Sequence, residues 1–572
     1  MRLKSISVKN FRSLADIEVP LESYTCFIGR NDAGKSSVLR AIELLLDPTQ
    51  SPTARDLSSF QDGTGIVEFC GEFVDVPALH PLSHNGSIKL RRRWGNGKDI
   101  CEFEGEVPVS NTLKAMASGM LTKAQLNDDK ELDIELRAEL NNLPDGKVQP
   151  TWWKEKYVEL DEKQLVAKET GWQSIAAKDV YEFFDVVFLT ADMRAQEESA
   201  DSETTVFGKL GGILFREACR AHPELLTARG ELERVLASLS TRDEEGNWSL
   251  GSIQRLEGVL QEEVNRFEPR VTVKPTATAP TVPKLDFRLG LDVRDEHVAG
   301  LTAMGHGLRR SLVFAMLRAL GRMQEIVGEE PAETIRQLRI FLVEEPELYL
   351  HPQAERARMR ELRELSEQEF TQVIACTHSA FFIDMSLYRS IVRLERANRN
   401  ASRVWAWSGN DLDADEKEKL KAIRAMHPTS AAALFADLAI LAEGPTEVGC
   451  LPSLAERLGI DTSSVEIVDC GGAGSVPMLA RVCDAFGIKY TTWFDQDRPD
   501  DITKAIAQAT AGRMALIVLD PDWEAVAGVP AGAGGKPWRS YSHFVLNNAA
   551  LPPELEFAIQ SAYGHTSLDM RP

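Results

Sequence analysis

The spacing of apolar and polar residues predicts that the chain begins with strands and then forms a strand–loop–helix unit. Ser5–Val8 and Ile17–Val19 alternate as half-buried strands do, whereas Tyr24–Ile28 predicts a buried strand. A glycine-containing loop follows, and then a helix from Ser36 to Leu46 that Pro48 ends. This order predicts the start of an α/β domain.

The middle of the chain has a different pattern. From Ser118 to Phe267 it is mostly helical, with charged faces and apolar rows at Leu210–Leu226 and Leu232–Leu239. The segment Lys274–Pro283, rich in proline and threonine, predicts an extended arm or an exposed loop. We therefore expect a long helical insertion followed by a connector.

The α/β pattern resumes with a helix at Leu308–Met323 and strands at Leu338–Val343 and Gln372–Cys376. The stretch from Arg396 to Ala431 is polar and charged, and we take it as the candidate domain junction. A second alternation of strand and helix follows at Leu438–Ala442, Val448–Leu458, Val465–Asp469, Val476–Phe486 and Lys489–Phe494. The pattern thus predicts two α/β domains.

Length and composition agree with this division into domains and argue against a membrane-spanning or secreted protein. A chain of 572 residues is too long for one hydrophobic core. It has no apolar stretch of membrane-spanning length and no signal-peptide core at its start, and its eight cysteines include no Cys-x-x-Cys pair. We expect a cytoplasmic protein that has reduced thiols and does not bind or span a membrane. The net charge of −22 argues against DNA binding by the overall field but leaves room for a local basic groove.

One loop carries a phosphate-binding pattern. Gly29–Ser36 fits G-x-x-x-x-G-K-[ST] between the predicted strand and helix, so a chance glycine loop is improbable. Lys35 would contact the β- and γ-phosphates of ATP, and the Ser36 hydroxyl would ligate magnesium. The expected nucleotide-binding residues of the loop are Gly29, Asn31, Gly34, Lys35, Ser36 and Ser37.

Two later segments complete an ATPase site. The strand that starts at Ile340 ends in Glu344, expected to hold magnesium through water, and Glu345, expected to polarise the attacking water. His378 follows the next apolar strand, where it can contact a γ-phosphate, although alone it would be a surface histidine. Because roughly 300 residues separate these segments from the loop, a large insertion is expected.

Four acids in the last third of the chain predict a divalent-metal site. Glu443 follows an apolar strand and lies four residues before Glu447, so both carboxylates share one side of a helix start. Asp495 and Asp497 flank one residue at the end of another strand, so they point the same way. Converging carboxylates repel one another unless cations lie between them. Any one of these acids alone is more often a solvated loop residue, but the set indicates a metal site.

The ATPase motifs resemble those of ABC/SMC-type ATPases. The resemblance covers Lys9–Leu14, Glu344–Pro352 and Thr377–Ser379. Gly305 and Gly307, just before a predicted helix, stand where that group has its signature motif, although the sequence departs from Leu-Ser-Gly-Gly-Gln. The resemblance implies that these glycines contact the γ-phosphate bound to a second protomer, and hence a dimer.

The acid pattern, with Gly471–Gly474 between its two halves, looks like a Toprim domain. An SMC-like ATPase followed by Toprim is the architecture of the OLD (overcoming lysogenization defect) family of nucleases. The resemblance implies a second metal site, for which we choose Asp522 and Glu524, with Asp520 as a further option. It also implies a lysine that assists phosphodiester cleavage; Lys536 is our choice, and a solvated loop lysine is an equal alternative.

The resulting fold class is α/β: an ABC/SMC-like P-loop ATPase with a helical, dimerisation-type insertion, followed by Toprim. We predict ATPase parts at 1–117 and 271–395, the insertion at 118–270, a junction at 396–430 and Toprim at 431–572. The resemblance implies an ATP-regulated DNA endonuclease that needs Mg²⁺ or Mn²⁺, acting in prokaryotic anti-phage defence as in Gabija-type systems or retron-associated effectors. Its expected partners are DNA, further copies in a dimer or dimer of dimers, and an adjacent helicase-like protein.

Two alternatives remain open. The first is an SMC-like ATPase that binds DNA ends or recombination intermediates and has a non-cleaving Toprim module. The second, less favoured, is a topoisomerase or primase, because the chain has no zinc ribbon and no length for a topoisomerase body.

Overall fold

The computed structural model describes residues 1–190 and 337–564 apart from short gaps, the longest within 118–147, and also residues 313–315. Contacts divide the chain into two units, Met1–Ala191 with Ile335–Pro572, and Asp192–Thr334. Gly305, Gly307, Asp497, the connector Lys274–Pro283 and most of the helix expected at Leu308–Met323 lie outside the described residues. No helix among the described residues is long and apolar enough to cross a membrane.

An antiparallel sheet forms the first layer of the N-terminal part. Its strands alternate buried and exposed positions, as Val67–Val74 does, so one face is available for packing. In sheet order the strands are β2 (Leu14–Pro20), β1 (Arg2–Phe11), β4 (Val67–Val74), β5 (Ile88–Gly95), β6 (Lys98–Pro108) and β7 (Lys168–Ser174).

A second, mostly parallel sheet carries the nucleotide motifs. Its central strands are buried except at one end of β9 and one end of β10, as expected when both faces are covered. In sheet order the strands are β12 (Ala401–Ala406), β11 (Ile391–Ala397), β3 (Tyr24–Ile28), β10 (Thr371–Cys376), β9 (Leu338–Glu344) and β8 (Phe184–Leu189), with β12 antiparallel to β11.

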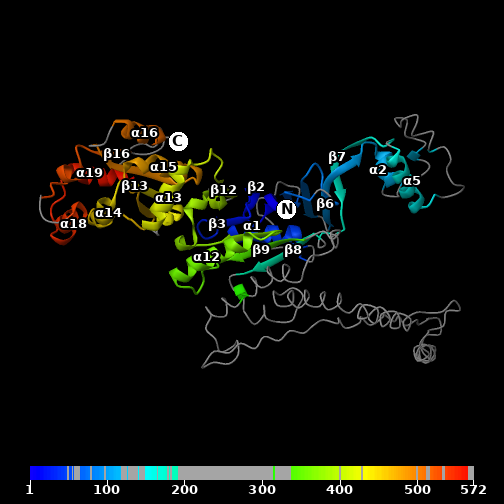
Figure 1. Ribbon diagram of the computed structural model, residues 1–572, viewed down its shortest axis with the longest axis horizontal. Helices are drawn as coiled ribbons and strands as arrows, with labels where there is room; N and C mark the ends of the chain where they lie inside the picture. Colours follow the sequence, from blue (N-terminus) through cyan, green and yellow to red (C-terminus); the bar gives the residue numbers. More distant parts are fainter. Residues whose placement is uncertain are drawn as a thin grey trace, which may run out of the picture. The chain divides into compact units, whose positions relative to one another are not determined.

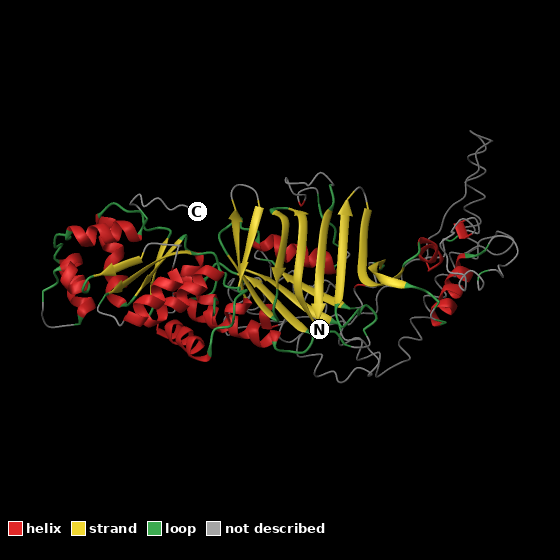
Figure 2. Cartoon of the chain, turned by 90° about the horizontal axis from the view of Figure 1, so that it is seen from above, coloured by secondary structure: helices red, strands yellow, loops and turns green. Residues whose placement is uncertain are grey.

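Helix α1 (Lys35–Leu46) packs between these two sheets, where its apolar residues join one core with side chains of both. The strands of the sheets are drawn in yellow in Figure 2. The remaining described helices of this part are α2 (Asn111–Ala117), α5 (Pro150–Glu162), α12 (Pro352–Ser366) and α13 (Ala414–Met426). The helix predicted from Ser36 thus begins one residue earlier, at Lys35.

The segment 118–270 contains two strands as well as helix α5, which differs from its mostly helical pattern. Strand β7 pairs with β6, and β8 pairs with β9, so both extend sheets of the N-terminal part. Phe184–Leu189 is rich in aromatic and β-branched residues, a strand signal that the charged helical surroundings obscured. The limits of the insertion and of the junction remain predictions.

The C-terminal part is a small parallel sheet in the order β14 (Val465–Asp469), β13 (Leu438–Ala442), β15 (Lys489–Asp495), β16 (Leu516–Leu519). Around it lie α14 (Pro445–Arg457), α15 (Val476–Ala485), α16 (Asp500–Thr510), α17 (Trp523–Ala527), α18 (Lys536–Tyr541) and α19 (Pro553–Ala562), labelled in part in Figure 1. The chain leaves β13 toward β14 and leaves β15 toward β16. The gap between β13 and β15 is therefore a topological switch point, where open α/β sheets bind ligands at the carboxyl ends of their strands.

Candidate functional site

The phosphate-binding loop is shaped by its backbone. Gly29 has φ +135° and Gly34 has φ +101°, conformations that L side chains rarely adopt. A Cβ added to Gly29 would lie 2.1 Å from the carbonyl oxygen of Leu394, so no other residue fits there without movement of the main chain. The loop leads from β3 directly into α1, which begins at Lys35.

Lys35 hydrogen-bonds back to the start of this loop. Its Nζ donates to the carbonyl oxygens of Gly29 at 2.8 Å and Arg30 at 2.9 Å. Burial lowers the pKa of Lys35, and the nearby carboxylates of Glu345 and Glu347 act in the opposite direction. Of the other loop residues expected to bind nucleotide, Asn31 and Ser36 are exposed and Ser37 is buried.

Sheet register brings the later motifs to the same edge. Strand β10 lies between β3 and β9, with Cys376 opposite both Phe27 and Glu344. The residues that follow these strands, Glu345 and His378, are therefore neighbours of the P-loop. His378 Nε2 lies 4.0 Å from Glu345 Oε1, and burial and then Lys35 lower the pKa of His378 while Glu345 opposes them. The structure thus gathers Lys35, Glu344, Glu345 and His378.

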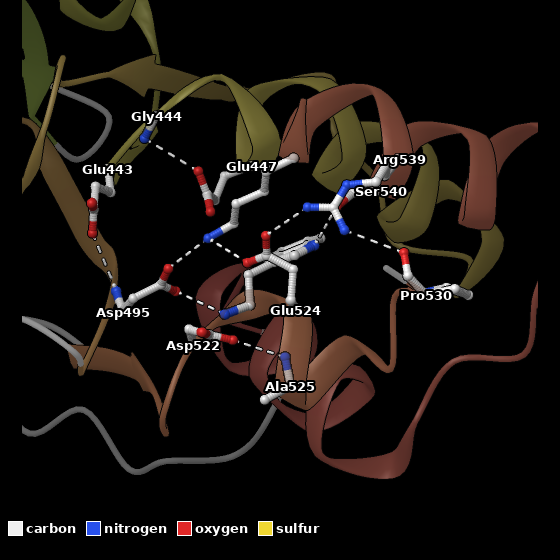
Figure 3. Close-up of polar contacts among 12 residues, drawn as sticks. Glu443, Gly444, Glu447, Asp495, Asp522, Glu524, Ala525, Pro530, Arg539 and Ser540 are labelled. Atoms are coloured by element: carbon white, nitrogen blue, oxygen red, sulfur yellow. Dashed lines mark hydrogen bonds and ion pairs between the residues drawn. The ribbon is translucent and has the colours of Figure 1, made fainter. Parts of the chain in front are cut away.

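The acids of the C-terminal part meet at the switch point between β13 and β15 (Figure 3). Glu443 follows β13, and its backbone N–H donates to Trp493 O on β15 at 3.0 Å. Its carboxylate Oε2 in turn accepts from the backbone N–H of Asp495 at 3.3 Å. Main-chain contacts from one strand therefore orient the acid that follows the other.

Glu447 lies in the first turn of α14, where its Oε2 accepts from Gly444 N at 3.2 Å. The residue is only 4% exposed. Burial, reinforced by nearby Asp495 and opposed by Lys536, raises the pKa of Glu447 to about 7. Cations stabilise neighbouring carboxylates, and the hard oxygen donors of these acids fit Mg²⁺ or Mn²⁺.

Lys536 supplies one such cation. Its Nζ lies 2.7 Å from Asp495 Oδ2 and 2.9 Å from Glu524 Oε2. Burial opposes the shift, but the hydrogen bonds to Asp495 and Glu524 raise the pKa of Lys536. The second oxygen of Asp495 accepts from Trp523 N at 3.0 Å, so this aspartate is held on both sides. The lysine is thus placed at the acids and not in a solvated loop.

The other acids chosen from the sequence have different surroundings. Asp522 is the N-cap of α17, where its Oδ1 accepts from Ala525 N at 2.8 Å, and Asp520 is exposed after β16. Within the described residues, which leave out Asp497, no three His, Cys, Asp or Glu side chains form a metal-binding group. Lys536 takes the position between Asp495 and Glu524 instead.

Arg539 is a site residue that the sequence patterns did not identify. One of its guanidinium nitrogens lies 3.4 Å from Glu524 Oε1, and another donates to Pro530 O at 3.2 Å. It stands three residues after Lys536 on the same helix, so both reach one side of α18. This spacing of three residues from Lys536 is the feature of the sequence from which Arg539 could have been identified. Trp523 Nε1 also donates to Ser540 Oγ at 2.9 Å, which ties α17 to α18 beneath the site.

Comparisons with known proteins agree with this arrangement. The family described as AAA ATPase domain matches residues 1–383, and the family described as overcoming lysogenization defect protein-like, TOPRIM domain, matches residues 434–497. These matches confirm the predicted combination of an α/β ATPase domain with a C-terminal Toprim domain.

Named relatives cover most of the chain. The Old nuclease of Escherichia phage P2 is 25% identical over 510 residues, which is 87% of this chain and 77% of the relative. The OLD nuclease of Thermus scotoductus is 24% identical over 589 residues, 96% of each chain. Among solved structures, an SMC head bound to the C-winged helix domain of ScpA aligns with 71% of this chain and 98% of its own, at 13% identity and a TM-score of 0.37.

Proposed function

The chain belongs to the OLD family of nucleases, with an AAA ATPase domain and a Toprim domain, and from this premise we propose that it is a divalent-metal-dependent DNA endonuclease regulated by ATP. The observation that carries the proposal is the convergence of Glu443, Glu447 and Asp495 with Lys536 at the switch point of a parallel sheet.

In this proposal the acids divide between two metal ions. Glu443, Glu447, Asp495 and Asp497 would hold one, and Asp522 and Glu524 the other. Mg²⁺ or Mn²⁺ bound there supplies the activated water and neutralises the leaving oxygen of the phosphodiester. Lys536 keeps its proton, because Asp495 and Glu524 raise its pKa, and can donate it in a hydrogen bond to a phosphate oxygen.

The ATPase site would control access to this centre. Lys35 and Ser36 would bind the phosphates and Mg²⁺, and Glu344 would hold the Mg²⁺ through a water molecule. Glu345 would polarise the attacking water, and His378 would lie beside the γ-phosphate. Gly305 and Gly307 would complete the site from a second protomer. ATP binding would therefore favour a dimer or a dimer of dimers.

The biological setting follows from the family resemblance. We propose a cytoplasmic protein that cleaves foreign DNA in prokaryotic anti-phage defence, with an adjacent helicase-like protein as partner. Because the net charge is −22, contact with DNA would depend on the bound metal ions and on local lysines and arginines.

A second candidate has one observation in its favour. Lys536 lies between Asp495 and Glu524, at 2.7 and 2.9 Å, where a metal ion would otherwise neutralise them. A Toprim module held in this way permanently would bind DNA ends or recombination intermediates without cleaving them. The ATPase would then be the only enzymatic activity.

Plasmid cleavage with Mg²⁺ or Mn²⁺, with and without ATP, separates the two candidates. Glu443→Ala is expected to lower cleavage by at least about 10³-fold, since a ligand of the reacting metal is lost. Lys35→Ala is expected to retain cleavage and to lose its dependence on ATP. ATP hydrolysis without cleavage under every condition would favour the second candidate, and unchanged cleavage in Glu443→Ala would contradict the assigned centre.

A further inference from the structure

Glu347 lies just beyond the two acids that end the catalytic strand of the ATPase domain. The chain turns twice after β9: Leu348 N donates to Glu345 O at 3.1 Å, and Leu350 N donates to Glu347 O at 3.0 Å. Glu345 and Tyr349 both have positive φ, +42° and +65°. These turns keep Glu347 near the strand ends before α12 begins at Pro352.

The carboxylate of Glu347 contacts the segment that carries His378. Its Oε1 accepts from the backbone N–H of His378 at 2.7 Å. Burial raises the pKa of Glu347, and the hydrogen bond from His378 opposes that change. Hydrogen bonds to an ionised, buried acceptor are among the stronger ones in proteins.

The same carboxylate lies close to the rest of the ATPase site. Glu347 and Glu345 are both among the acids that raise the pKa of Lys35 against its burial. The imidazole of His378 lies 4.0 Å from Glu345, whose own backbone N–H donates to Cys376 O at 2.9 Å. Strand pairing thus fixes the main chain of Glu345, while Glu347 fixes the main chain of His378.

We propose that Glu347 is a positioning residue of the ATPase site, which accepts the backbone N–H of His378 and thereby holds the imidazole beside Glu345. The inference rests on the proposed hydrolysis of ATP at this site. Glu347 acts through His378 and needs no contact with the nucleotide.

Steady-state ATP hydrolysis by the full chain tests this role. Glu347→Ala is expected to lower kcat by about 10- to 100-fold, because the buried hydrogen bond that holds His378 beside Glu345 is lost. The Kd for a fluorescent ATP analogue is expected to change less than about threefold, because the P-loop contacts remain. Glu347→Gln keeps an acceptor oxygen of the same reach, so it is expected to restore most of the activity.

A double mutant separates positioning of His378 from general loosening. If Glu347 acts through His378, Glu347→Ala adds less than about a twofold loss in a His378→Ala background. Glu355→Ala is the matched control, because Glu355 accepts from the Ser379 hydroxyl, one residue beyond His378. Its ATP hydrolysis is expected to stay within about threefold of wild type.

Three results would overturn the assignment. They are a wild-type kcat in Glu347→Ala, losses in the double mutant that equal the product of the two single losses, and a loss in Glu355→Ala as large as that in Glu347→Ala. Failure of the proposed function has a different signature, because the wild-type protein would then hydrolyse no ATP, or Lys35→Ala would hydrolyse it as fast as wild type.

Discussion

The ATPase site and the carboxylate site both form at the carboxyl ends of parallel strands, but the first is made mainly by the main chain and the second by side chains. The P-loop is a backbone structure, in which Gly29 and Gly34 have positive φ and Lys35 donates to two loop carbonyls. The carboxylate site consists of side chains from the residue after β13, from α14, β15 and α17, and from α18, whose Lys536 contacts Asp495 and Glu524.

This difference decides what each site tolerates. A site made by main-chain geometry depends on residues that permit that geometry, so it is sensitive to an added methyl group. A site made by converging charges depends on the balance between acids and cations, so it is sensitive to a lost charge.

Substituting alanine for one glycine in each site tests the contrast directly. Gly29→Ala is expected to weaken ATP binding by at least about 100-fold, because strain at φ +135° adds to a Cβ only 2.1 Å from Leu394 O. In Gly444→Ala the new Cβ meets only Glu447 Oε2, at 4.0 Å, and φ is an ordinary −162°. DNA cleavage by Gly444→Ala is therefore expected to stay within about threefold of wild type.

Isothermal titration with ATP and plasmid cleavage without ATP measure both variants. Retained metal-dependent cleavage in Gly29→Ala shows that the protein is folded and that the damage is local. If both substitutions caused large losses, or if neither did, the division into a site made by the backbone and a site made by side chains would be contradicted.

Removing the cation from the carboxylate site should have the next largest effect. Lys536→Met is expected to lower cleavage by about 100-fold, as the loss of a preorganised donor to a transition-state oxygen does. The Mn²⁺ affinity is expected to stay equal or to rise, because Asp495 and Glu524 lose their competing ammonium at 2.7 and 2.9 Å. Arg539→Met removes only the ion pair with Glu524, and it is expected to lower cleavage by about tenfold.

The exposed Lys489 at the start of β15 provides the control, and Lys489→Met is expected to cleave as wild type does. Cleavage assays and Mn²⁺ titration should be run together. A Lys536→Met variant that loses Mn²⁺ binding would show that the lysine supports the fold of the site, in contradiction to a role at the phosphate.

The same contrast explains how much could be predicted from the sequence. The strand, loop and helix around Gly29–Ser36 were predicted within one residue, because the pattern itself encodes the backbone geometry. The sequence also predicted that Glu443, after β13, and Asp495, at the end of β15, lie at one edge of the sheet, since the carboxyl ends of neighbouring parallel strands meet there. Their role as metal ligands stays a prediction. Residue type and strand order were sufficient there.

Other features depend on contacts between distant segments. The contacts of Lys536 with Asp495 and Glu524 depend on where α18 packs, which no local pattern states, and Arg539 was missed for the same reason. Strand β7 was missed because Lys168–Ser174 has little apolar content and becomes a strand by pairing with β6. The ligand role of Asp522 stays a prediction, and its N-cap contact shows that a short-range role can use the same carboxylate.

The smallest predicted effect concerns a contact between the two regions. Arg30 of the P-loop donates through one nitrogen to both carboxylate oxygens of Asp437, each at 3.1 Å, and Asp437 directly precedes β13. The side chains are 73% and 50% exposed, so solvent and salt screen the pair. A double-mutant cycle with Arg30→Ala and Asp437→Ala is expected to give a coupling of at most about 1 kcal/mol in the free energy of unfolding.

The ATP dependence of cleavage in the same variants decides how the two sites communicate. If the ATPase site and the carboxylate site act independently, breaking the Arg30–Asp437 pair changes the stimulation of cleavage by ATP by less than about fivefold. That factor corresponds to about 1 kcal/mol. The small effect should disappear at high salt, where the Debye length falls to about 3 Å. A loss of ATP control in both single variants at unchanged ATP affinity would instead make the Arg30–Asp437 pair a mechanical link, and the two sites would have to be treated as one.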